Sequence, residues 1–260
     1  MKKLVLVLGL LGSVISFGAK LKVGASPVPH AQLLQLVKDD LKNENVELEI
    51  IELTDYVTPN LLLDSKELDA NFFQHKPYLE TFSKEKNLKL VSAGNVHVEP
   101  LGVYSKKVNK IENLKKGGVV AIPNDPTNGG RALILLHNNG IIKLKNPQDL
   151  LATEFDIVEN KNNLKFKSLD AAQIPRALED VDLAVVNGNY AIEAGLNPLT
   201  EALIIEGKES PYANLIAVRE GDEKKEDIQK LVKALQSEKV KVFIENTYKG
   251  GVVPAFLFYI

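Results

Sequence analysis

The loop at 124–131, with the sequence NDPTNGGR, places a scarce residue type in an unfavourable position. The chain contains three arginines against 29 lysines, and Arg131 lies in the first turn of a predicted apolar helix. A cation there opposes the helix dipole, whose N-terminal end is already positive. A guanidinium can grip a carboxylate through two parallel hydrogen bonds, and the amides of Gly129 and Gly130 can approach the same anion. The loop therefore predicts a site for a ligand anion. A salt bridge to a nearby Asp or Glu is the structural alternative.

Four asparagines lie in polar stretches that follow predicted strands, where ligands bind in α/β sheets. An asparagine amide offers both donors and acceptors, which suits a zwitterion that carries an amine and a carboxylate. Turn formation alone is the simpler explanation for any single one of them. These candidates are Asn128, Asn187, Asn189 and Asn214.

Aromatic residues in the same stretches could line an apolar pocket, although each is also a good core residue. Phe72 and Phe73 are neighbours in a predicted strand, so their side chains face opposite ways. At most one of the two should therefore line a cleft. The set comprises Tyr56, Phe72, Phe73, Tyr78 and Tyr104.

Three histidines and one glutamate offer a rival, metal-binding interpretation. His97 and Glu99 form an HxE pair, and together with His30 and His75 they could make a zinc site. The spacings HExxH, HxH and CxxC are missing from the sequence, which argues against a metal. No GxSxG-type nucleophile elbow is present either, so an enzyme is the least favoured class.

Short apolar strands alternate with amphipathic helical stretches along the chain. The predicted helices include one at 130–140, one at 168–180 and a final one that runs to about Asn246. Alternation of this kind, with near-continuous apolar strands, implies parallel sheets that are covered by helices on both faces. The sequence therefore predicts an α/β fold. The strands are expected at 21–25, 46–53, 68–73, 88–94, 97–105, 118–123, 181–187 and 214–220.

Two α/β lobes fit this pattern better than one large sheet. We expect the chain to cross between them at 97–105 and again at 214–220. Lobe 1 is then discontinuous and comprises 20–101 and 217–260, while lobe 2 comprises 102–216.

The first 19 residues are typical of a secretory signal peptide, because two lysines precede an apolar run from Leu4 to Ile15 and small residues follow. The sequence has no cysteine, which excludes disulfides, thiolate metal sites and lipid attachment at the cleavage site. The formal charge of −2 becomes about −4 without Lys2 and Lys3, and both signs are mixed along the chain. This balance argues against nucleic acid or an anionic membrane as a partner.

Six stretches, taken in order, resemble the MetQ/NlpA family of methionine-binding proteins, which are substrate-binding components of ABC importers. The resemblance covers essentially the whole chain after the signal peptide. It implies a type II periplasmic-binding fold, in which two lobes close on an amino acid. It also implies that the protein is not an enzyme, needs no cofactor, and delivers its ligand to a membrane permease and its ATPase. The stretches are LTDYVTPN (53–60), DANFFQHKPYLE (69–80), HVEPLGVYS (97–105), VAIPNDPTNGGRAL (120–133), VVNGNYAIEAGLNP (185–198) and SPYANLIAVRE (210–220).

The resemblance also implies roles for individual residues. Arg131 would hold the ligand carboxylate, and Asn187, Asn189 and Asn214 would hold the amino and carboxylate groups. The thioether would sit among side chains drawn from Tyr56, Phe72 or Phe73, His75 and His97. Asn128 is part of the same NDPTN loop as Arg131.

Two departures from the family pattern affect what we expect. Phe72 stands where many relatives have tyrosine, so the choice among D-methionine, L-methionine, a methionine dipeptide and another apolar amino acid stays open. Many relatives are lipoproteins anchored through a cysteine, which this sequence does not contain. We therefore expect a monomeric protein that is released into a periplasm.

Overall fold

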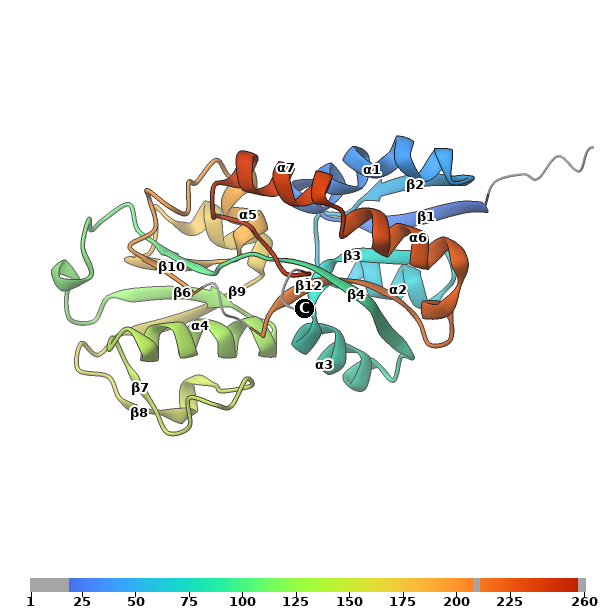
Figure 1. Ribbon diagram of the computed structural model, residues 1–260. Coiled ribbons are helices and arrows are strands. Elements are labelled where there is room, and N and C mark those ends of the chain that lie inside the picture. Colours follow the sequence, from blue (N-terminus) through green and yellow to red (C-terminus); the bar gives the residue numbers. More distant parts are fainter. Residues whose placement is uncertain (1–18, 208–210, 257–260) are drawn as a thin grey trace, which may run out of the picture.

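The computed structural model describes residues 19–207 and 211–256, which form two lobes, each built around its own sheet (Figure 1). The strand order is β13-β4-β12-β3-β1-β2 in the first sheet and β11-β5-β10-β6-β9 in the second. The first sheet contains β1 (Ala19–Ala25), β2 (Val46–Glu52), β3 (Ala70–His75), β4 (Leu90–Val98), β12 (Ala213–Arg219) and β13 (Val253–Pro254). The second contains β5 (Gly102–Tyr104), β6 (Val119–Pro123), β9 (Lys165–Leu169), β10 (Leu183–Val186) and β11 (Ile204–Ile205). A small antiparallel pair, β7 (Lys143–Leu144) and β8 (Ile157–Glu159), lies outside both sheets.

The signal peptide predicted at 1–19 falls outside the described residues, except for Ala19, where β1 begins. No helix in the described part of the chain combines the length and the apolar character that a membrane span requires.

Helices cover both faces of the first sheet. Three helices, α1 (Gln32–Asn43), α6 (Glu226–Leu235) and α7 (Glu238–Tyr248), share one apolar core with β1 and β2. The segment Pro27–Ala31 leads into α1 and is kinked at Val28, whose backbone is extended (φ −130°, ψ 136°). The opposite face is covered by α2 (Thr58–Asp64) and α3 (Lys76–Lys86). The single final helix predicted from the sequence is wrong: it is interrupted at Ser237, whose side chain caps α7 by accepting a hydrogen bond from the amide of Val240.

The second sheet is likewise covered on both faces. One face packs against α4 (Pro126–Asn138), which buries Leu133 and Leu136. The other face packs against a 3₁₀ helix at Ala171–Ala177 and against α5 (Gly188–Glu193). The longer α-helix predicted at 168–180 is wrong here, because Pro175 lacks an N–H and cannot continue the α-helical hydrogen-bond pattern.

The chain passes between the lobes twice. It leaves the first sheet after β4 and enters the second at β5; it leaves the second after β11 and returns at β12. The predicted boundary after residue 216 falls inside β12, whose residues pair with β3 and β4 of the first sheet. The return crossing therefore lies before Ala213.

The sheets are mixed rather than parallel. Four of the strand pairings in the two sheets are parallel and five are antiparallel. In the first sheet β12 and β13 run opposite to the other four strands, and in the second sheet β5 runs opposite to the other four. The strand that receives the chain after each crossing, β5 or β12, is therefore antiparallel to its neighbours, and the periodicity of the sequence does not indicate this direction.

Candidate functional site

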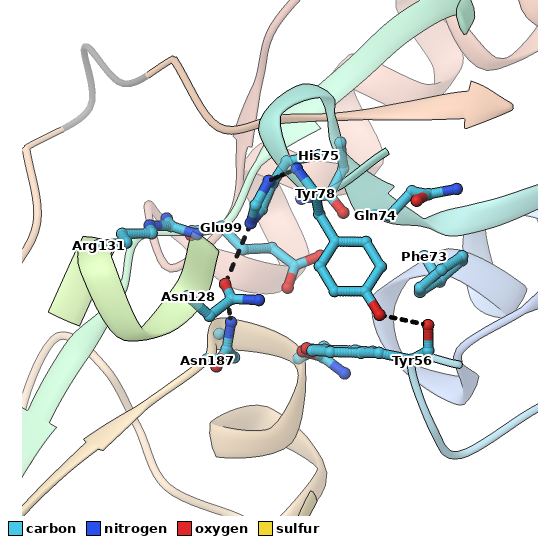
Figure 2. Close-up of a pocket in the computed structure, with 12 residues that line it drawn as sticks. Tyr56, Phe73, Gln74, His75, Tyr78, Glu99, Asn128, Arg131 and Asn187 are labelled. Atoms are coloured by element: carbon cyan, nitrogen blue, oxygen red, sulfur yellow. Dashed lines mark hydrogen bonds between the residues drawn. The ribbon is translucent and has the colours of Figure 1, made fainter. Parts of the chain in front are cut away.

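A small cavity, with a free volume of about 20 Å³, lies where the chain crosses between the lobes (Figure 2). Both lobes contribute to its wall, so the cavity exists only when they are together. The lining residues are Tyr56, Phe73, Gln74, His75, Tyr78, Glu99, Asn128, Arg131, Asn187, Gly188, Asn189 and Asn214.

The first lobe places its polar residues through one row of paired strands. Asn214 of β12 lies opposite His75 of β3 on one side and His97 of β4 on the other. His75 ends β3 and caps α3, because its Nδ1 accepts a hydrogen bond from the amide of Tyr78 at 3.2 Å. The ring proton therefore sits on Nε2, which donates to Oδ1 of Asn128 in the second lobe at 3.1 Å. Burial, helped by the charge of Arg131, lowers the pKa of His75 to about 3, so the ring is neutral at pH 7.

The second lobe places its polar residues at the ends of two parallel strands. β6 and β10 are neighbours, so α4 and α5, which follow them, begin at the same edge of the sheet. Asp125 caps α4 by accepting from the amide of Asn128 at 2.9 Å, and it also holds the side-chain amide of Asn128 at 2.9 and 3.0 Å. Asn187 precedes α5 without a capping hydrogen bond, and its Nδ2 instead donates to Oδ1 of Asn128 at 2.9 Å.

Two amide atoms of this lobe are buried and have no hydrogen-bond partner among the described residues. They are the acceptor Oδ1 of Asn187 and the donor Nδ2 of Asn189. The other amide atom of Asn189, Oδ1, accepts from the hydroxyl of Tyr56 across the cleft at 2.6 Å. Because buried polar groups are nearly always paired, these two atoms indicate places where a ligand would bind.

Arg131 is buried, with 3% of its surface exposed, and it contacts both segments that cross between the lobes. Its Nε and Nη2 donate to the carboxylate of Glu206 at 3.0 and 2.5 Å, and Nη2 also donates to the carbonyl of Glu99 at 2.8 Å. The guanidinium lies 4.3 Å from the ring centre of Tyr212. The salt bridge that we considered as the alternative for Arg131 is thus present, although it is buried. Nη1 makes no hydrogen bond within the described chain and stays available for a second carboxylate.

One end of the cavity is aromatic. The rings of Tyr56, Phe73 and Tyr78 lie 5.8 to 5.9 Å apart, and the Tyr78 hydroxyl donates to the carbonyl of Tyr56 at 2.7 Å. Phe72 points the other way: it is fully buried, and its ring packs against those of His30 and His97 at 4.7 and 5.3 Å. Strand alternation therefore selects Phe73 for the cavity and excludes Phe72.

Three of the four residues of the rival metal site come together at the cavity, where Glu99 lines the wall and His30 and His97 lie behind it. Nε2 of His97 and Nε2 of His30 lie 2.7 and 3.2 Å from Oε1 of Glu99, and all three residues are buried. His75 is not part of this cluster, because its Nε2 is bonded to Asn128.

Eight of the ten predicted binding residues line the cavity, whereas Phe72 and His97 lie behind it. The lining also includes Glu99, which the sequence suggests as a metal ligand, and Tyr78, which it suggests as a pocket or core aromatic. Gln74 and Gly188 also line the cavity, and the sequence does not predict a role for either. The side chain of Gln74 is held by buried hydrogen bonds to the side chains of Asn60 and Asn71. No pattern in the sequence predicts this network.

Comparison with known proteins agrees with this arrangement. Residues 21–256 match the family model described as NlpA lipoprotein. The chain is 43% identical over 236 residues to the D-methionine-binding lipoprotein MetQ of Escherichia coli K12, which covers 90% of this chain and 87% of that protein.

Two solved structures are similar over nearly their whole length. One is a nutrient binding protein from Burkholderia cenocepacia bound to methionine, with 48% identity, a TM-score of 0.88, and coverage of 91% of this chain and 100% of that one. The other is a periplasmic substrate-binding protein of an ABC transporter from Coxiella burnetii, with 43% identity, a TM-score of 0.87, and coverage of 90% and 100%. On the family match and these identities, the chain belongs to the NlpA lipoprotein family.

Proposed function

We propose that the protein is the substrate-binding component of an ABC importer and that it captures methionine in the cavity between its lobes. The names of its relatives support this proposal, since they include a D-methionine-binding lipoprotein and a nutrient binding protein bound to methionine. The proposal covers both D-methionine and L-methionine. Binding assays decide between these ligands and the alternatives, which are a methionine dipeptide and another apolar amino acid.

The observation that carries the proposal is the division of the cavity into a polar end and an aromatic end. At the polar end, Nη1 of Arg131 and Nδ2 of Asn189 are donors suited to a carboxylate, and Oδ1 of Asn187 is an acceptor suited to an amine. At the other end, Tyr56, Phe73 and Tyr78 provide ring edges and faces for an apolar side chain. A thioether sulfur gains about 0.3–1.5 kcal/mol from contact with an aromatic ring.

Replacement of Arg131 tests the carboxylate assignment. Truncating one partner of a buried, hydrogen-bonded charge pair costs about 2–5 kcal/mol, so Arg131→Ala should weaken methionine binding about 30- to several-thousand-fold. Isothermal titration of protein that has been unfolded and refolded to remove retained ligand measures the change.

The matched control is Arg176→Ala, since Arg176 is an exposed arginine of the same lobe. Its affinity should equal that of the unmodified protein. Arg131→Ala also leaves Glu206 without its cation, so the double variant Arg131→Ala/Glu206→Gln is measured beside it. If that double variant folds and still binds methionine tightly, Arg131 does not bind the ligand carboxylate.

We further propose that the protein acts in a periplasm after removal of the signal peptide predicted at 1–19, and that no catalytic step accompanies binding. The relatives are named as lipoproteins, whereas this sequence contains no cysteine, so we expect a released protein rather than an anchored one. We expect the protein to be a monomer and to bind a membrane permease that works with an ATPase. Cell fractionation tests the location, and light scattering tests the oligomeric state.

A further inference from the structure

The charges around the cavity leave one buried carboxylate without a cationic partner. Arg131 is already paired with Glu206. Glu99 lines the cavity with only 5% of its surface exposed, and within the described chain it forms no ion pair with a lysine or arginine side chain. Its two closest partners, His97 and His30, are neutral at pH 7, because burial lowers their pKa values to about 3 and about 4.

Several donors nevertheless hold the Glu99 carboxylate in place. Nε2 of His97 lies 2.7 Å from the carboxylate, and the backbone amide of Asn189 favours its charged form. Nε2 of His30, which is hydrogen-bonded to Oδ1 of Asn214 at 3.0 Å, lies 3.2 Å from Glu99. Burial raises the pKa of Glu99, while these donors and the charge of Arg131 favour the ionised form. A buried carboxylate surrounded by neutral donors is costly unless a cation joins it, which is why such groups are usually paired.

The second lobe closes directly over this carboxylate. At Gly188, the first residue of α5, an added Cβ would lie 2.7 Å from Cβ of Glu99 and 3.3 Å from its Oε2. Figure 2 shows the Glu99 side chain entering the cavity between Arg131 and Tyr78. Glycine at this position lets the polar edge of α5 approach Glu99, so a group bound there would be shielded from water on both sides.

We propose that Glu99 is the receptor for the ammonium group of the ligand, and that His30 and His97 are positioning residues that fix its carboxylate. The inference rests on the proposed function and narrows its substrate class to ligands with a free, protonated α-amino group. Oδ1 of Asn187, the unpaired acceptor of the facing lobe, lines the same cavity and is available to accept a second hydrogen bond from the ammonium. The site then pairs each end of the zwitterion with a protein group of opposite charge.

A metal ion is the other cation that this cluster could accept, and the hydrogen positions argue against it. The 2.7 Å contact fits a proton shared between Nε2 of His97 and Glu99, and a metal would have to displace that proton. Moving the proton to Nδ1 would leave it without a partner, because Nδ1 of His97 and Nδ1 of His30 are both buried without a hydrogen bond among the described residues. Metal-bound histidines almost always donate from their second nitrogen.

The test compares methionine with 2-hydroxy-4-(methylthio)butanoate, which keeps the carboxylate and thioether but replaces the amine with a hydroxyl. Affinities are measured by titration calorimetry for the unmodified protein and for Glu99→Gln, at pH 7.5 after ligand removal. We expect the unmodified protein to prefer methionine by at least about 30-fold, because the analogue leaves Glu99 unpaired. In Glu99→Gln, methionine should weaken by a similar factor and the preference should fall to a few-fold.

The outcomes separate this inference from the proposed function. If the unmodified protein does not bind methionine, the proposed function fails. If it binds methionine but Glu99→Gln keeps the full preference, the function stands and the ammonium assignment is overturned. Stoichiometric zinc binding that Glu99→Gln abolishes, with methionine preference unchanged, would overturn it as well. Where Glu99→Gln does not fold, His97→Gln serves as the second variant: it should reduce the preference for methionine, and an unchanged preference contradicts the positioning role.

Discussion

Acidification should destabilise the ligand-free protein strongly, because three histidines are buried in the neutral form. His30, His75 and His97 have pKa values lowered to about 4, 3 and 3, mainly by burial. In the unfolded chain each titrates near pH 6.5. Below pH 6.5 the unfolded chain binds protons at these histidines while the folded protein does not. This contribution to stability is therefore fully present above pH 6.5, and it is lost as the pH falls toward the pKa values of the folded protein.

The size of the loss follows from the same pKa values. At pH 5 an unfolded histidine is almost fully protonated while the folded one is nearly neutral, which costs about 2 kcal/mol per residue. Three residues give a fall of about 6 kcal/mol in the free energy of unfolding between pH 7 and pH 5. Glu99 acts in the opposite direction, since its pKa is raised by burial, so this figure is an upper limit. A typical domain has about 5–15 kcal/mol of stability in total, so the loss is large.

Urea unfolding followed by circular dichroism at pH 7, 6 and 5 measures this loss on protein freed of ligand. The variant His75→Gln keeps a donor toward Asn128 but removes one titrating group, so its fall should be about one third smaller. A free energy of unfolding that is level between pH 7 and pH 5 would refute the reasoning. If the free energy of unfolding falls equally in the parent protein and in His75→Gln, His75 does not contribute one third of the pH dependence.

Three further predictions concern single contacts. Tyr56→Phe should weaken methionine binding about 10-fold and change the melting temperature little, because it removes the 2.6 Å hydrogen bond to Asn189 that joins the lobes; calorimetry and thermal melts check both. Gly130→Ala should lower the free energy of unfolding by about 1–3 kcal/mol, because the new Cβ would lie 2.3 Å from the carbonyl oxygen of Leu150. In the control Gly129→Ala the new Cβ meets nothing closer than 3.0 Å, so the change should stay within about 1 kcal/mol. Equal urea midpoints for the two variants would contradict the packing argument. Leu34 lies on the buried face of α1, so Leu34→Ala should lower the free energy of unfolding by about 2–5 kcal/mol, against about 0.5 kcal/mol or less for Leu61→Ala at a half-exposed position. A similar loss in both variants would contradict this prediction.

Local sequence was sufficient for the parts of the site that each element builds by itself. The NDPTNGGR loop specifies a cap at Asp125 and a buried Arg131 at the start of α4. Strand alternation required that only one of Phe72 and Phe73 could line the cavity. Nothing local indicated Glu206, the partner of Arg131, because it lies 75 residues further along the chain on the return crossing.

The HxE pattern of His97 and Glu99 indicates neighbouring side chains but does not say what they share. Residues two apart in a strand face the same side, so the pattern correctly predicted that the two side chains are close. Spacing alone does not distinguish a shared metal from a shared proton. That distinction came from the 2.7 Å contact and from the burial that keeps both histidines neutral.

The position of β12 has a consequence for the order in which the protein can fold as it is synthesised. β12 lies between β3 and β4 in the first sheet, yet it follows every strand of the second sheet in the chain. A nascent chain that has reached Gly207 holds all five strands of the second lobe, while β3 and β4 of the first still have unpaired edges where β12 belongs. Such edges invite pairing with other chains. The second lobe can therefore assemble early, whereas the first remains exposed to aggregation until the last fifth of the protein has emerged.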